Sequence, residues 1–427
     1  MAHLSSWYAV EQLGSSGDGL VFINGQPLFI PGTLPGEEVR LSGRDHDLTL
    51  EEVRNISPDR VEPPCALSDQ CGGCSLQHIN LEKLLSWKQE RVTQALHHAG
   101  FSNIPEAHCT QIEPYSRRRM DFVLQRKEGG VIVGLHQRGG DPVDMTECSL
   151  LDKRLFSLLP ALRLCLSHIG ALTGRGGLLI NLLETGPDLV LETKAPLSAT
   201  DKAKLADFAR AQNIPRIAWR SSSLEEPETI VQWKPVFHHF GTVKVTPPPG
   251  AFMQATLQSE QILVNAVLNG LPSLNKKDVI EELYAGNGTF SYPLGEANRV
   301  QAYEGHKPAF EALKASSHGT KVAPFHRDLK RQPLIAADLK HARVVVLDPP
   351  FAGAGRQMEF LAQSNVQDVI YISCNPAMLA KDLKPLQQMG FEIVRYDLVD
   401  QFLWSADSET VLALSRDTKR IRKSRKR

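Results

Sequence analysis

Three patterns of apolar and polar positions follow one another along the first half of the 427-residue chain. From Trp7 to about Ser57, short β-favouring runs alternate with turns rich in Gly and Pro, which predicts a small β-barrel. Residues 81–101 carry apolar side chains at spacings of three and four and stop near Gly100, as expected of an amphipathic helix. A mixed region of strands and helices then continues to about Val245.

The second half of the chain has a different pattern. Pro247, Pro248 and Pro249, followed by Gly250, cannot continue a helix or a central strand, so we place a domain boundary there. Beyond it, apolar runs alternate with helical ones, which predicts an α/β domain with a largely parallel sheet and helices on both faces. The runs that we interpret as strands are 278–284, 299–304, 342–348, 368–373, 391–399 and 409–415.

We therefore expect three domains and a short tail, a number that suits the chain length. The predicted units are a barrel over 1–58, a central α+β domain over 59–246, an α/β domain over 247–416 and a basic tail over 417–427. The tail is too polar to join a core, so we interpret it as solvated, although it could also contact phosphate groups.

Charge and composition exclude several classes of protein. The chain has 48 basic and 48 acidic residues, so any surface for a polyanion must be local. The start, MAHLSSWYAV, lacks the features of a secretory signal, and no run approaches the roughly 20 apolar residues of a membrane span. We expect a cytoplasmic protein that does not bind membranes.

Glycines and carboxylates stand where the predicted strands of the α/β domain end. Gly286 and Gly288, in ELYAGNGTF, would let the backbone turn closely around a ligand, although such a pair more often marks an ordinary turn. Glu304 ends the next strand and could accept hydrogen bonds from two ribose hydroxyls. Asp348 precedes two prolines at a third strand end. These features together predict a cofactor site at the carboxyl edge of the sheet.

Cys374 lies between a predicted strand and a predicted helix in DVIYISCNPAMLAKDL. A thiol at the amino terminus of a helix should have a lowered pKa, because the helix dipole favours the thiolate. An isolated cysteine is more often a small buried apolar residue. The flanking Ser373, Asn375 and Pro376 favour the interpretation as a nucleophile.

Three more cysteines form the pattern CxxxxxCxxC at Cys65, Cys71 and Cys74, with two glycines that allow a sharp fold. Seven cysteines in a reducing compartment make metal binding or catalysis a better explanation than disulfides. Cys109 and Cys165 have no partner at metal-ligand spacing, and we interpret them as apolar residues.

These motifs resemble the uracil-5 RNA methyltransferases, in particular their iron–sulfur-containing ribosomal RNA branch. The similarity runs from about Trp7 to Arg416, and the segment 17–39 is similar to the TRAM RNA-binding barrel. ELYAGNGTF, LDPPF and SCNPAMLAKDL resemble the cofactor and nucleophile motifs of the family. The resemblance implies a Rossmann-like class I methyltransferase domain that uses S-adenosylmethionine, behind an OB-like TRAM barrel and a central iron–sulfur domain.

The resemblance also implies roles for individual residues. Cys374 would be the nucleophile and Glu409 the proton acceptor. The positions that match the S-adenosylmethionine contacts of the family are Gln254, Tyr284, Thr289, Glu304, Asp328 and Asp348. Four positions depart from the family pattern: Thr289 and Asp328 replace an asparagine of some relatives, Phe351 stands where Arg is frequent, and Asp407 stands where His is common.

The chemistry that such an enzyme performs explains why it needs a thiol. Carbon 5 of uracil is too weak a nucleophile to take a methyl group directly from a sulfonium. A thiolate that adds to carbon 6 turns the ring into an enolate, after which carbon 5 attacks the methyl group. A base must then remove the carbon 5 proton, and a carboxylate with a raised pKa, such as Glu409 beside an apolar strand, suits this step.

By the same resemblance, Cys148 completes a four-thiolate set with Cys65, Cys71 and Cys74 for a [4Fe-4S] cluster. Four thiolates suit zinc equally well, so zinc is the alternative. The cluster would be structural or would position RNA, because methyl transfer moves no net electrons. Residues 117–119, all Arg, could contact phosphate or form a solvated charged strand.

The expected partner is RNA, with ribosomal RNA favoured over transfer RNA because the cluster-bearing relatives mostly act on it. The target uridine should be single-stranded or in a loop, since its ring must be extruded. We expect a monomer. The alternatives are an amino-group methyltransferase, which DPPF also suits, a radical enzyme, for which CxxxCxxC is missing, and a non-catalytic RNA-binding or ribosome-assembly protein.

Overall fold

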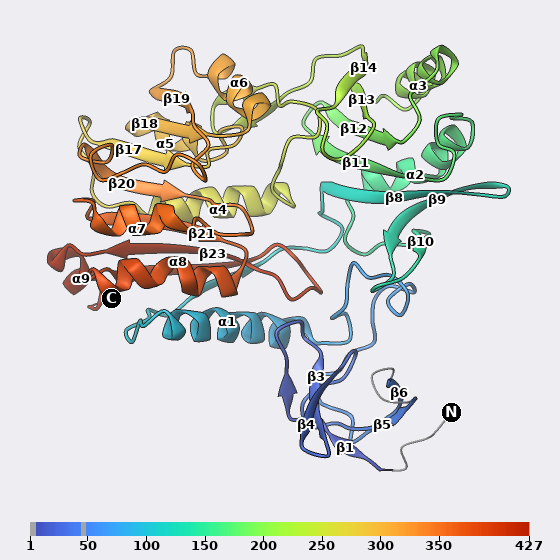
Figure 1. Cartoon of the computed structure of the whole chain (residues 1–427), viewed down its shortest axis with the longest axis horizontal. Helices are drawn as coiled ribbons and strands as arrows, with labels where there is room; N and C mark the ends of the chain where they lie inside the picture. The colour runs from blue at the N-terminus through green and yellow to red at the C-terminus, as the bar shows by residue number, and fades with distance from the viewer. Residues whose placement is uncertain (1–5, 44–47, 427) are drawn as a thin grey trace.

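The structure, a computed structural model, describes residues 6–43 and 48–426. Outside these ranges lie residues 1–5, which belong to the segment judged not to be a secretory signal, residues 44–47 of the predicted barrel, and Arg427 of the basic run. Figure 1 shows an eight-stranded sheet with its helices on the left, a seven-stranded sheet at the upper right and the amino-terminal strands below. No helix within the described ranges is long and apolar enough to cross a membrane.

The amino-terminal part contains two three-stranded antiparallel sheets, ordered β1-β5-β6 and β2-β3-β4. The strands are β1 (Tyr8–Ala9), β2 (Gln12–Leu13), β3 (Gly19–Ile23), β4 (Gln26–Ile30), β5 (Glu38–Ser42) and β6 (Thr49–Arg54). Asn24 and Gly25 join β3 to β4 with φ values of 54° and 78°, as a two-residue hairpin requires. Val21, Val39 and Leu41 belong to one apolar cluster shared by both sheets. Closure of these strands into a barrel stays a prediction.

The central part is built on a seven-stranded sheet with the order β10-β9-β8-β11-β12-β13-β14, in which only β12 and β13 pair in parallel. Its strands are β8 (Arg119–Lys127), β9 (Gly130–His136), β10 (Pro142–Asp144), β11 (Arg175–Leu183), β12 (Gly186–Thr193), β13 (Arg216–Arg220) and β14 (Glu228–Gln232). Its helices are α2 (Lys153–Ser167) and α3 (Ala199–Ala211). Buried side chains of the sheet and of both helices form one apolar core.

The α/β part contains the eight-stranded sheet β19-β18-β17-β20-β21-β23-β22-β7. Its strands are β7 (His108–Gln111), β17 (Val279–Leu283), β18 (Arg299–Glu304), β19 (Val322–His326), β20 (Ala342–Leu347), β21 (Asp368–Ser373), β22 (Glu392–Asp400) and β23 (Glu409–Ser415). Neighbours from β19 to β21 are parallel, whereas β23 is antiparallel to both β21 and β22. The predicted strands and the largely parallel α/β sheet are confirmed.

Helices cover both faces of this sheet, because side chains that alternate along each strand are buried on opposite sides. One core contains residues of α1 (Leu81–His98), α7 (Arg356–Gln363) and α8 (Pro376–Gln388). The opposite core contains residues of α4 (Leu257–Gly270), α5 (Ser291–Ala297) and α6 (Lys307–Ser316). The hairpin of β15 (His238–Phe240) and β16 (Val243–Val245) also contributes to this second core.

The α/β part includes residues from before the predicted boundary at 246. The helix α1 buries Val92 and Leu96 in the same core as α8, and β7 pairs in parallel with β22 at the edge of the sheet. Lys88 of α1 forms a fully buried ion pair with Asp400, with Nζ and Oδ1 2.6 Å apart. A boundary read from one proline run could not reveal this, because the pairing joins segments that are nearly 300 residues apart.

The basic run near the carboxyl terminus forms helix α9 (Thr418–Ser424), and most of its basic side chains are exposed to solvent, as its composition suggested. Asp417 caps the helix, Ile421 is buried, and the guanidinium of Arg420 lies 2.5 Å from Asp368 Oδ1. The helix is docked by Ile421, by Arg420, which also contacts the carbonyl of Gly270, and by an ion pair of Arg425 with Glu392.

Candidate active site

The carboxyl ends of five neighbouring parallel strands meet at one edge of the eight-stranded sheet, and predicted site residues lie at each end. From the outermost strand inward these residues are Asp328 after β19, Glu304 at the end of β18, Tyr284 after β17, Asp348 after β20 and Cys374 after β21. The sheet thereby brings residues separated by up to 90 positions to one edge. Open parallel sheets bind ligands at this edge.

The glycine loop after β17 lies against Glu304. The backbone N–H of Gly286 donates to Glu304 Oε2 at 2.7 Å, and that of His306 donates to Oε1 at 2.6 Å. A Cβ on Gly288 would lie 2.3 Å from the ring of Tyr292, so only glycine fits there. Packing against Tyr292 thus determines the shape of the loop. The two loop hydrogen bonds hold the Glu304 carboxylate at the edge of the loop, and its oxygens can accept further hydrogen bonds.

The remaining predicted cofactor residues differ in exposure. Thr289 is half-buried in the same loop, whereas Asp328 is exposed and accepts hydrogen bonds from the backbone of Lys330 and Arg331 at 3.0 and 3.3 Å. The buried Asn287, which the sequence interpretation passed over, donates to the carbonyl of Phe252 at 3.3 Å. Its position inside the motif ELYAGNGTF was the available signal.

The segment after β20 is fixed to the segment that carries Cys374. Asn375 Nδ2 donates to the carbonyl of Phe351 at 3.0 Å, and Asn375 Oδ1 caps the first turn of α8. Asp382 of α8 accepts from the backbone N–H groups of Ala354 and Gly355 at 2.6 and 3.1 Å. The Phe351 side chain is exposed. Asp348 and Cys374 therefore stand on two loops that are tied together.

Glu409 reaches the same edge because β23 runs antiparallel to β21. The register pairs Ser373 with Thr410. Cys374, which follows Ser373, and Glu409, which precedes Thr410, therefore lie next to each other at the edge. Glu409 is buried, and only one of its oxygens has a partner: Oε1 accepts from Gln401 Nε2 at 3.1 Å, while the buried Oε2 has none. Gln401 was missed by the sequence interpretation, which found no motif at that position.

The electrostatic setting of Cys374 differs from the prediction. Burial, followed by the carboxylates Glu409, Asp348 and Asp407, raises its pKa to about 12, so the expected lowered pKa is wrong for the protein without ligands. Cys374 precedes the cap residue Asn375, whose side chain takes the first free N–H groups of α8. Burial and the neighbouring Asp348 raise the pKa of Glu409 as well, as expected of a carboxylate beside apolar strands.

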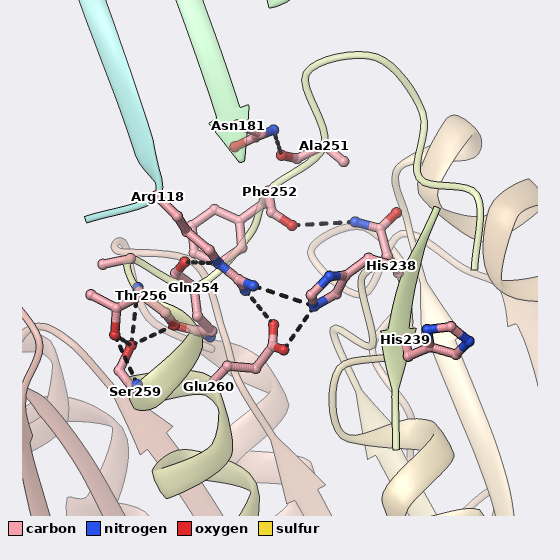
Figure 2. Close-up of polar contacts among 12 residues, drawn as sticks. Arg118, Asn181, His238, His239, Ala251, Phe252, Gln254, Thr256, Ser259 and Glu260 are labelled. Atoms are coloured by element: carbon pink, nitrogen blue, oxygen red, sulfur yellow. Dashed lines mark hydrogen bonds and ion pairs between the residues drawn. The ribbon is translucent and has the colours of Figure 1, made fainter. Parts of the chain in front are cut away.

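Gln254 connects this edge to the central part of the molecule. Its Oε1 accepts from Gln401 Nε2 at 3.0 Å, and its carbonyl accepts from Arg118 Nε at 3.0 Å. Arg118 is buried and lies 2.5 Å from Glu260 Oε2, a contact visible in Figure 2. Both alternatives for the arginine run, phosphate contact and a solvated charged strand, are therefore wrong for Arg118, whose charge is neutralised inside the protein.

The four predicted cluster ligands line one cavity of about 200 Å³. Burial, reinforced by Cys148, Cys71 and Cys65, raises the pKa of Cys74 to about 12. A Cβ on Gly72 would lie 2.7 Å from the carbonyl of His136, so the turn between the cysteines needs glycine. Within residues 6–43 and 48–426, no group of three or more His, Cys, Asp or Glu side chains is arranged to hold a metal ion.

Comparisons with known proteins agree with this architecture. A model of the tRNA (Uracil-5-)-methyltransferase family matches residues 248–417. An uncharacterized RNA methyltransferase of Brucella melitensis is 34% identical over 416 residues, which cover 95% of this chain and 97% of the relative. The 23S rRNA (uracil(1939)-C(5))-methyltransferase RlmD of Pectobacterium atrosepticum is 29% identical over 426 residues, which cover 96% and 93%.

Among solved structures, the tRNA (uracil-54, C5)-methyltransferase of Pyrococcus abyssi in complex with S-adenosyl-L-homocysteine has the same fold. The TM-score is 0.70 at 20% identity, and the match covers 96% of this chain and 100% of that one. The chain thus has an α/β fold with a Rossmann-like methyltransferase domain. The chain belongs to the RNA (uracil-5-)-methyltransferase family and is an S-adenosylmethionine-dependent enzyme.

Proposed function

We propose that the enzyme methylates carbon 5 of uracil through a covalent bond between Cys374 Sγ and carbon 6 of the ring. The observation that carries this proposal is the register of β21 and β23, which sets Glu409 beside Cys374 at the same edge as the glycine loop. A nucleophile and a base within one small region are what the reaction needs.

In the proposed reaction, the Cys374 thiolate adds to carbon 6, and the ring electrons move to the carbon 4 oxygen. Carbon 5 of this enolate takes the methyl group from the sulfonium, which leaves as S-adenosylhomocysteine. Glu409 then removes the carbon 5 proton, the double bond re-forms, and the bond between carbon 6 and sulfur breaks. The unpartnered Oε2 of Glu409 is available for this proton, and its raised pKa suits the transfer.

We assign the cofactor to the loops at the carboxyl edge. The residues proposed to contact S-adenosylmethionine are Gln254, Tyr284, Thr289, Glu304, Asp328 and Asp348. Glu304 would accept hydrogen bonds from the ribose hydroxyls in addition to those from the loop, since a carboxylate has about four acceptor positions. The positive sulfonium would be stabilised by the carboxylates near Cys374.

The proposed substrate is 23S ribosomal RNA, and the protein would act as a cytoplasmic monomer. The relative from Pectobacterium, which is named for this activity, matches this chain over nearly its whole length. Transfer RNA is the second candidate, because the Pyrococcus enzyme named for it shares the fold. We propose that the amino-terminal strands form a TRAM-like barrel that contacts the RNA around an extruded uridine.

Cys65, Cys71, Cys74 and Cys148 would hold a [4Fe-4S] cluster, which would stabilise the central part or position RNA. Their common cavity and the glycine turn between them fit such a group. A zinc ion would need the four sulfurs at about 2.3 Å from one point. In a [4Fe-4S] cluster each thiolate binds a different iron, so the four sulfurs need not meet at one point.

A trapping experiment tests the proposed reaction. RNA containing 5-fluorouracil should form a denaturation-resistant adduct with the protein and S-adenosylmethionine, because the fluorine at carbon 5 cannot be removed as a proton. Cys374→Ala should form no adduct, whereas Cys109→Ala, the control at a cysteine of β7, should match the wild type. Methyl transfer that persists in Cys374→Ala would contradict the mechanism. Mapping 5-methyluridine in cells with and without the gene would identify the RNA.

A further inference from the structure

We propose that Gln401 is a positioning residue for Glu409: its side-chain amide holds one carboxylate oxygen, so that the other is presented as the proton acceptor. The inference rests on the proposed function of Glu409 and adds a residue to which neither the sequence motifs nor the family resemblance assigns a role. It concerns the step in which the covalent intermediate is resolved.

Gln401 reaches Glu409 because of strand topology. It directly follows Asp400, the last residue of β22, and the register pairs Val399 with Glu409 on the antiparallel strand β23. The Gln401 side chain is buried, and its Nε2 lies 3.1 Å from Glu409 Oε1 and 3.0 Å from Gln254 Oε1. One amide group thus bridges the proposed base and a proposed cofactor contact.

The orientation of the amide is determined by its other neighbours. Gln401 Oε1 accepts from Ser259 Oγ at 2.7 Å and from the backbone N–H of Ala255 at 3.2 Å. A flipped amide would set an oxygen against the Glu409 carboxylate and an NH₂ group against the Ala255 N–H. Both hydrogens of Nε2 are therefore directed to acceptors. Rotating or flipping the amide would break these hydrogen bonds.

The segment that contacts Gln401, residues 254 and 255, is held in place by Arg118 of the central part. Arg118 donates from its backbone to the carbonyl of Ala255 at 2.8 Å and from Nε to the carbonyl of Gln254 at 3.0 Å. Figure 2 shows Arg118 between this segment and Glu260 of α4. The contacts run without a break from a buried ion pair, through residues 254 and 255, to Gln401 and Glu409.

This arrangement has a chemical consequence for Glu409. The donation from Gln401 favours the carboxylate, whereas burial and the charges of Asp348 and Asp407 favour the protonated form. Cys374 also faces this cluster of carboxylates. Removing the Gln401 donor should raise the pKa of Glu409 further and free its side chain to rotate, so the base should be both less available and less well placed.

The test compares Gln401→Leu with the wild type in single-turnover methylation of ordinary RNA. The variant should form the covalent intermediate but resolve it more slowly, by about 10-fold to about 100-fold, so that a methylated adduct accumulates. The rate of resolution should rise with pH through a midpoint that lies higher than in the wild type. Gln367→Leu, at an exposed glutamine, is the matched control and should behave as the wild type.

The outcomes separate this inference from the function on which it rests. Resolution at the wild-type rate and pH midpoint would overturn the role of Gln401 alone. An equal loss of adduct formation, resolution and cofactor binding would show a merely structural role and would also overturn it. If the wild type forms no adduct with 5-fluorouracil RNA, the proposed mechanism itself fails. Gln401→Met, which keeps an unbranched side chain, serves in the same assays if Gln401→Leu does not fold.

Discussion

The catalytic edge and the cysteine cavity are held in place by different means. Cys374 directly follows β21 and Glu409 is the first residue of β23, and the hydrogen bonds between these two strands fix them relative to each other. Cys65, Cys71 and Cys74 lie instead in a turn-rich segment without a helix or strand, and Cys148 follows the short strand β10. The edge is therefore formed before any ligand binds, whereas the cavity should depend on the group that occupies it.

The largest effect is expected from the base at the edge. Glu409→Gln should lower multiple-turnover methylation by about 10²-fold to about 10⁴-fold, because a general base is lost, while the methylated covalent adduct accumulates. The measurement is transfer of labelled methyl groups, with the adduct resolved on denaturing gels. Glu392→Gln, at a surface ion pair with Arg425, is the control. Normal turnover in Glu409→Gln would assign the proton to another group.

The next effect concerns Arg118, which connects the catalytic edge to the central part of the molecule. Arg118→Ala should reduce the free energy of unfolding by about 3–5 kcal/mol, since it leaves the buried Glu260 carboxylate without its guanidinium partner and with only His238 in contact. Arg119→Ala removes a more exposed ion pair with Asp121 and a contact with the ring of Phe252, and it should cost about 1 kcal/mol. Urea unfolding followed by circular dichroism measures both. Equal losses in the two variants would contradict a special role of the buried pair.

The rate at which Cys374 is alkylated should depend on the charge of the bound cofactor. With a pKa of about 12, its thiolate fraction rises about tenfold per pH unit near neutrality, and alkylation by iodoacetamide should rise accordingly. Alkylation should be faster with S-adenosylmethionine than with S-adenosylhomocysteine, which occupies the same space. The reason is that the positive sulfonium of the former stabilises the thiolate, whereas the neutral sulfur of the latter does not. Mass spectrometry of the Cys374 peptide measures the rates, with Cys109 as the internal control. Identical rates with the two ligands would argue against a sulfonium beside the thiol.

The smallest effect on the catalytic edge is expected from the cysteine cavity. Cys74→Ser should reduce the iron content of the purified protein from about four atoms per chain to near zero. Its affinity for S-adenosylmethionine should stay within about twofold, because the cofactor loops depend on the sheet. Metal analysis and calorimetric titration measure these quantities, with Cys165→Ser as the control. A parallel loss of cofactor binding would mean that the two regions are not independent.

Much of the α/β part could be predicted because its strands and loops carry local patterns. The apolar runs are continuous, as in a sheet that is buried on both faces, and Gly288 marks a position where a side chain does not fit. Helix α9 could not be predicted, because its docking depends on Ile421 and on Asp368, a residue some 50 positions away.

The electrostatics of the candidate site differ from those that the sequence predicted. The sequence placed Cys374 near a helix terminus, and the dipole argument followed from that position alone. Its thiol is instead surrounded by Glu409, Asp348 and Asp407, which strand pairing brings from separate segments. A pKa depends on charges within a few ångströms, and spacing along the chain does not give those distances.

By itself, the sequence determined the class of fold, the order of its strands along the chain and the motif that carries Cys374. It did so because periodicity, turn residues and short motifs are local properties of a chain. Only the tertiary structure decided that α1 and β7 complete the eight-stranded sheet, that Arg118 is neutralised by Glu260, and that Gln401 holds Glu409. Each of these contacts joins residues by register and burial, which are fixed only when the strands have paired.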